Sequence, residues 1–237
     1  MTITRISVQR APTGRVRVDL RAGELSPRLL DRGPDVVRVA LVATVALLLA
    51  GDDVVVEVDV GPGVRLHLVE TSGTVAYDMR GGSASWRVDA RVGRDATLVW
   101  VGLPFVVSAG ADVTRRTSVT LGSRARAMVR ETVVLGRTGE VGGDLLLSAD
   151  VRQADGRPVL REELHLSREH RHGAALLGGA RCLDQVTLLG LRADLAGPGV
   201  LHLAEPGTVV RTLTDDLHQS GLTAVCRYLE SEISRRA

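Results

Sequence analysis

A strand-corner-strand pattern recurs in the middle of the chain and constrains the fold more than any other feature. It first runs from Asp53 to Glu70, where apolar residues alternate up to Gly61-Pro62-Gly63 and then resume. Counted from Gly61, the apolar places lie at −7, −5, −3, −1, +3, +5 and +7. This alternation predicts two half-buried strands joined by a tight corner.

The same register returns around Gly93 and Gly122, so the unit repeats about every 30 residues. Arg115 breaks the pattern at the outermost apolar place of the third copy. A two-stranded unit cannot bury its apolar face alone, and stacking on its neighbours solves this. We therefore predict a mainly β protein with layered or solenoid-like β-structure, a β-helix-like stack of strands. An antiparallel sandwich with glycine turns is the alternative.

No linker or low-complexity run divides the chain, so we predict a single β-rich domain, residues 1–237. Asp155-Gly156 lies between two alternating stretches and predicts a hairpin. The apolar segment Val36 to Ala50 is too short in its charge-free part to span a bilayer as a helix. It predicts a buried strand pair or a short core helix.

One or two helices are expected at the C-terminal end. The segment from Pro206 to Leu217 begins with residues typical of a helix N-terminus. Apolar residues from Leu222 to Ile233 follow helical spacing. A last strand over Thr223 to Tyr228 is the alternative for the second segment.

Composition argues against several classes of function. The 30 basic residues are all arginine and are spread along the chain, the net charge is +2, and aromatic residues make up 2%. Nucleic-acid binding normally uses a basic patch and stacking aromatic rings. Cys182 and Cys226 have no metal-ligand spacing, and no signal peptide is evident at the N-terminus. We expect a cytoplasmic protein that binds neither nucleic acid nor membrane.

Few residues suggest chemistry. No serine lies in a nucleophile elbow and no glycine-rich loop matches a P-loop, so these motifs indicate no particular reaction. On a strand, His170 and His172 would share one face, and with a third donor they could hold a transition metal. A solvated turn is the alternative. A metal-dependent enzyme built on this pair would need a third ligand and an open coordination position.

Four short stretches, in order, resemble the urease accessory protein D family. They are Gly51-Asp52 with the strand and corner that follow, the Thr/Ser-rich segment 71–77, Leu98 to Pro104, and Glu131 to Arg137 with Gly139-Glu140 just beyond. The resemblance covers roughly residues 45 to 165. Two departures are Leu47 to Ala50, where the family usually has paired glycines, and Phe105, where it usually has an acid or amide.

The resemblance implies a non-enzymatic scaffold for maturation of the urease metallocentre. Such a scaffold contacts apo-urease and a helical, UreF-like accessory protein, and through that partner a nickel-carrying, UreG-like GTPase. Ni²⁺ would be in transit along an internal passage, with no tightly bound cofactor. A β-rich interaction adaptor without a metal role is the alternative function.

The positions that match family motifs and could line this passage are Asp52, Ser72, Thr74, Glu131 and Glu140. Turns, a solvated bend or a solvated strand face would explain the same residues without any metal. Sharp corners with positive φ would explain Gly51, Gly61, Gly63 and Gly136.

Overall fold

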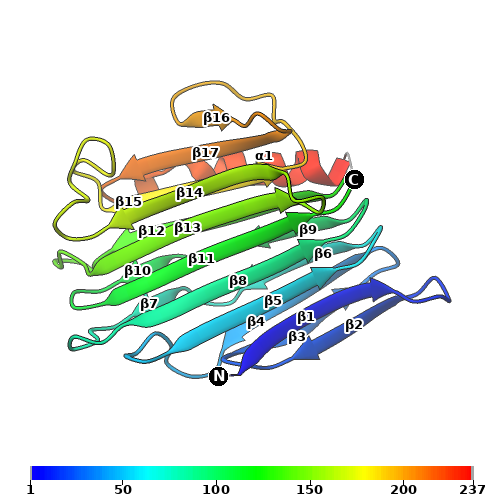
Figure 1. Cartoon of the computed structure of the whole chain (residues 1–237), viewed down its shortest axis with the longest axis horizontal. Helices are drawn as coiled ribbons and strands as arrows, with labels where there is room; N and C mark the ends of the chain where they lie inside the picture. Colours follow the sequence, from blue (N-terminus) through cyan, green and yellow to red (C-terminus); the bar gives the residue numbers. More distant parts are fainter. Residues whose placement is uncertain (1, 236–237) are drawn as a thin grey trace.

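The computed structural model describes residues 2–235 and consists of two β-sheets stacked face to face (Figure 1). Each predicted repeat places one strand in each sheet. In the front sheet of Figure 1 these strands are β5 (Asp53–Val60), β8 (Ala84–Val92) and β11 (Asp112–Leu121). In the back sheet they are β6 (Arg65–Glu70), β9 (Thr97–Val101) and β12 (Arg126–Leu135). The solenoid-like stack predicted from the sequence is confirmed.

The two sheets share a parallel centre with antiparallel margins. The front sheet has the order β14-β13-β11-β8-β5-β1-β2. Its further strands are β1 (Ile3–Arg10), β2 (Val16–Arg21), β13 (Asp144–Gln153) and β14 (Pro158–Leu166). The last two form the hairpin predicted at Asp155-Gly156.

The back sheet has the order β16-β17-β15-β12-β9-β6-β4-β3. Its further strands are β3 (Leu25–Arg32), β4 (Val36–Ala43), β15 (Cys182–Leu189), β16 (Val200–His202) and β17 (Gly207–Thr214). Two short strands, β7 (Thr74–Ala76) and β10 (Phe105–Val107), pair with each other, and β10 also pairs with the end of β12.

The glycine corners stack directly on one another. The backbone N–H of Gly93 donates to Val60 O, and that of Gly122 donates to Val92 O, both at 2.7 Å. A Cβ on Gly122 would lie 2.7 Å from the backbone nitrogen of Arg94. The repeating glycine in the sequence therefore reflects the close approach of one corner to the previous one.

Three of the four predicted corner glycines have positive φ, namely Gly51 (87°), Gly63 (64°) and Gly136 (83°). The expectation is wrong for Gly61, which is absent from the positive-φ residues of the described chain. At Gly61 a Cβ would instead lie 2.1 Å from Oε1 of Gln9. That oxygen is the far end of a flexible side chain, and the nearest backbone atom, Gln9 Cα, would lie 3.1 Å away, so the contact is tight but adjustable.

Most of the core lies between the sheets, and a second, smaller core lies on the outer face of the back sheet. Helix α1 (Leu222–Arg235) covers that face with its buried residues Leu222, Cys226, Leu229 and Ile233. A short 3₁₀ helix, η1 (Leu217–Gln219), precedes it. No helix in residues 2–235 is long and apolar enough to cross a membrane.

Two local predictions were wrong. The segment from Pro206 contributes strand β17, because its run of β-branched residues pairs along the whole length of β15. Val36 to Ala50 forms one strand, β4, followed by an irregular segment, rather than a strand pair or helix. The C-terminal region thus has one α-helix, and Thr223 to Tyr228 belong to it.

Candidate functional site

An arginine and a glutamate face each other in the interior between the sheets. Arg115 lies on β11 and Glu131 on β12, and each is 8% exposed. Nε and Nη2 of Arg115 both lie 3.4 Å from Oε1 of Glu131. The Thr117 hydroxyl donates to the same oxygen at 2.8 Å. A charged pair therefore lies within the largely apolar core between the sheets.

Two aromatic rings enclose the arginine. Its guanidinium carbon is 4.6 Å from the ring centroid of Phe105 and 5.4 Å from that of Trp86. The two rings meet edge to face at 6.0 Å. Cation–π attraction stabilises the guanidinium there and holds it out of water. The indole N–H of Trp86 is buried and has no hydrogen-bond partner among the described residues.

Glu70, at the end of β6, adds a second carboxylate. It accepts hydrogen bonds from Trp100 Nε1 at 3.0 Å and from the Leu103 N–H at 2.8 Å. Burial raises the pKa of Glu70, although these hydrogen bonds and the charge of Arg115 act in the opposite direction. A cavity of about 10 Å³ lies among these groups, close to the smallest space that holds one water molecule. We call Glu70, Arg115, Thr117 and Glu131 the interior polar cluster.

Of the five predicted passage residues, Glu131 lies in the interior polar cluster. Asp52 caps a turn, since its Oδ2 accepts from the Leu49 N–H at 2.9 Å. Ser72 is exposed in a bend, and Thr74 begins strand β7. None of these three lines the small cavity beside Glu131.

Glu140 is held within the loop that joins β12 to β13. Its carboxylate accepts from the backbone N–H and Nε of Arg137, at 3.0 and 2.8 Å, and from the Ala109 N–H at 3.2 Å. These contacts lower the pKa of Glu140 to about 2. Arg171 and Arg181 fix the same loop by donating to the carbonyl oxygens of Gly143 and Arg137. Glu140 therefore orders its own loop.

We expect Glu140→Gln to weaken the dependence of thermal stability on pH in the acidic range. The pKa of Glu140 is lower in the folded chain than its ordinary value of 4.5. The stabilisation is therefore present above about pH 4.5 and lost as the pH falls towards 2. Thermal denaturation of both proteins from pH 6 to pH 3 measures this. Glu169→Gln, which changes an exposed carboxylate, serves as the control. If the melting temperature fell equally steeply with pH in wild type and Glu140→Gln, Glu140 would not stabilise the fold through its carboxylate.

His170 and His172 lie in the loop between β14 and β15 and not on a strand face. Nδ1 of His170 is 2.9 Å from Ser167 Oγ, and Nδ1 of His172 is 3.3 Å from the carbonyl oxygen of Gly178. Across residues 2–235, no three His, Cys, Asp or Glu side chains form a group suited to a metal ion. The structure thus places the pair without a third ligand of these types.

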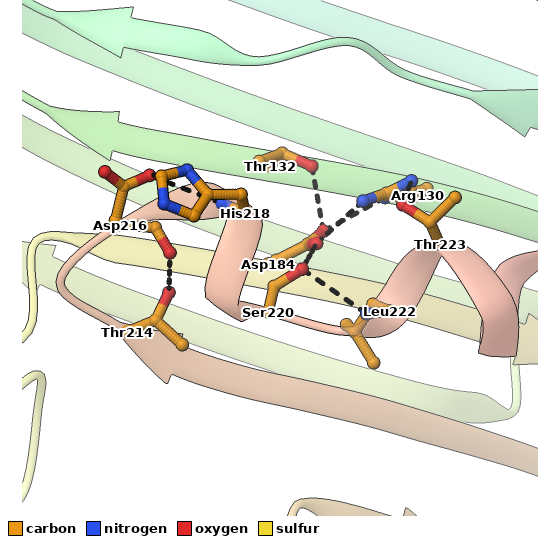
Figure 2. Close-up of polar contacts among 9 residues, drawn as sticks. All are labelled: Arg130, Thr132, Asp184, Thr214, Asp216, His218, Ser220, Leu222 and Thr223. Carbon is orange, nitrogen blue, oxygen red and sulfur yellow. Dashed lines mark hydrogen bonds and ion pairs between the residues drawn. The ribbon is translucent and has the colours of Figure 1, made fainter.

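A second buried charge, Asp184 on β15, lies on the opposite face of the back sheet, beneath the start of α1 (Figure 2). It is fully buried, and both carboxylate oxygens accept from Arg130, at 3.1 and 2.8 Å. Thr132 and Ser220 each donate a hydroxyl to it at 2.8 Å. Ser220 also accepts from the N–H of Leu222, the first residue of α1, at 3.3 Å. This Asp184 cluster fastens the helix to the sheet.

The family model described as UreD urease accessory protein matches residues 9–235. The chain belongs to the UreD family. Urease accessory protein UreD 1 of Streptomyces griseus is 42% identical over 239 residues, covering 97% of this chain and 92% of that protein. The UreD proteins of Frankia alni and of a Parafrankia strain are 37% and 35% identical, covering 85% and 84% of this chain. The UreD match includes every strand that carries the interior polar cluster.

The sequence analysis named Glu131 as a candidate through the family resemblance, but it did not name Glu70, Trp86 or Asp184. Arg115 gave the one visible signal, because it occupies an apolar place of the repeat. In this UreD chain the place that resembles an acid or amide position of the family holds Phe105, which packs against that arginine.

Proposed function

We propose that this chain is a non-catalytic scaffold for maturation of the urease metallocentre. It bridges apo-urease to a UreF-like helical protein and, through that protein, to a UreG-like GTPase. Ni²⁺ is its cargo in transit. The UreD family and relatives that are named urease accessory proteins support this role.

The observation that carries the nickel part of the proposal is the interior polar cluster. Burying charged groups between sheets is unfavourable, and an apolar filling of the same volume is often as stable or more stable. Glu70 and Glu131 supply carboxylate oxygens, which suit Ni²⁺ less well than imidazole does. Weak ligands of this kind fit a cation that must be released again.

We expect Glu131→Gln to slow nickel-dependent activation of urease about tenfold, because a neutral amide attracts a cation much less than a carboxylate does. The measurement is the initial rate of urease activation in a reconstituted mixture of apo-urease, accessory proteins and Ni²⁺. Glu57→Gln is the matched control, since Glu57 lies on the outer side of β5 and pairs with Arg5.

Two outcomes would contradict different parts of the proposal. Activation at the same rate without this chain would overturn the scaffold role. A requirement for the chain together with a normal rate for Glu131→Gln would overturn the passage through Glu131. The second result would favour an adaptor without a metal role, for which the existing Arg115–Glu131 pair is the supporting observation.

A further inference from the structure

The interior polar cluster is closed to a passing cation in this structure. The cavity beside Glu131 has a volume of about 10 Å³, enough for about one water molecule and too small for a hydrated metal ion. The positively charged guanidinium of Arg115 lies 3.4 Å from the carboxylate oxygen that the cation would approach. Both volume and charge oppose entry.

Arg115 also differs from its neighbours in the same row of the front sheet. Cross-strand pairing aligns it with Val54 of β5, Trp86 of β8 and Leu147 of β13, which are apolar and buried. A leucine or valine at this place would continue the core. The charge therefore serves something other than packing of the repeat.

The guanidinium is held loosely for a buried arginine. Both of its bonds to Glu131 share one oxygen at 3.4 Å, whereas charge-assisted bonds are usually about 2.7–2.9 Å long. Arg130, one residue before Glu131, instead donates to both carboxylate oxygens of Asp184, from Nε to Oδ1 at 3.1 Å and from Nη2 to Oδ2 at 2.8 Å. The guanidinium also lies over the ring faces of Phe105 and Trp86, which set no single hydrogen-bond geometry.

Two further features favour a second position for this side chain. Glu70 lines the same small cavity as Arg115 and Glu131, and the charge of Arg115 acts to lower the pKa of its carboxyl, so a second carboxylate lies near the guanidinium. The indole N–H of Trp86, beside the guanidinium, is buried and unpaired within the described chain. An unpaired buried donor is unfavourable, so the observed arrangement is not one in which every polar group is satisfied.

We propose that Arg115 is an ionic gate on the route of the cation. With its guanidinium on Glu131 the route is closed, and when the guanidinium moves away from Glu131 the carboxylate is free to receive the cation. This inference rests on the proposed function, because it assumes that Ni²⁺ passes through the interior polar cluster. Arg115 acts here as a positioning residue and does not itself bind the cargo.

The test is Arg115→Met in the reconstituted activation mixture, with Ni²⁺ limiting. We expect the initial rate to rise about threefold or more, because a like charge leaves the path of the cation. Arg116→Met is the matched control, since Arg116 is the next residue of β11 and is exposed on the outer face. Arg115→Lys keeps the charge and should activate urease at close to the wild-type rate.

A merely structural role for Arg115 would slow activation or leave it unchanged, so a faster rate is diagnostic. A folded Arg115→Met protein that still co-purifies with its partners but activates no faster than wild type would overturn the gate. If Arg115→Met does not fold, Arg115→Gln, which keeps polar donors without the charge, is subject to the same criterion. Failure of the passage itself is recognised separately, because Glu131→Gln would then activate at the normal rate.

Discussion

Asp184→Asn should destabilise the protein by about 3–5 kcal/mol, the range seen when one partner of a buried ion pair is removed. Asp184 is fully buried, and the substitution leaves the guanidinium of Arg130 beneath α1 without a compensating charge. The hydroxyls of Thr132 and Ser220 also lose a charged acceptor. Urea denaturation of wild type and variant, followed by circular dichroism, measures the change in the free energy of unfolding.

Asp150→Asn provides a matched control, because Asp150 pairs with Arg152 on the exposed side of the front sheet. Exposed pairs contribute little to stability. If Asp184→Asn were as stable as Asp150→Asn, the Asp184 cluster would not fasten the helix. Replacing both members of the buried pair, as Arg130→Met with Asp184→Leu, should recover much of the loss, since no charge is then left unpaired.

Gly122→Ala should also be clearly destabilising, by about 1–3 kcal/mol, as expected when extra volume is forced into a packed site. The new Cβ would lie 2.7 Å from Arg94 N and 2.8 Å from Gly93 C, which are backbone atoms of the preceding corner. Neither atom moves aside without shifting the stacked corner. The same denaturation experiment measures this effect.

Gly179→Ala is the control for the corner, because a Cβ at Gly179 would meet nothing within 4 Å. We expect that variant to unfold at nearly the same urea concentration as wild type. A Gly122→Ala protein as stable as Gly179→Ala would show that the stacked corners accommodate a Cβ without loss of stability. The glycine spacing in the sequence would then need another explanation.

The stack of repeats was predictable from the sequence because its determinants are local. Alternation of apolar residues sets each strand, and the glycines at 61, 93 and 122 mark where one corner must approach the next. Strand β17 was mispredicted because its structure depends on pairing with β15, a distant segment. Helix-start residues at Pro206 are a weaker influence than that pairing.

The candidate site was only partly predictable for a similar reason. Arg115 attracted notice as a charge in an apolar place, and Glu131 through a family motif. Glu70 and Asp184 each lie in ordinary strands, and their partners Trp100 and Arg130 are 30 and 54 residues away in the chain. Glu70 and Trp100 lie one repeat apart, so their spacing carried a signal, whereas the 54 residues between Arg130 and Asp184 correspond to no repeat and indicate no contact.

Strand β12 carries the two buried clusters on its opposite faces, through the consecutive residues Arg130 and Glu131. Because side chains alternate along a strand, sliding β12 by one residue would turn Glu131 towards α1 and Arg130 into the interior. Each cluster would then lose its partner of opposite charge at the same moment. The two ion pairs together therefore specify the register of β12 in the back sheet, because only one register satisfies both of them.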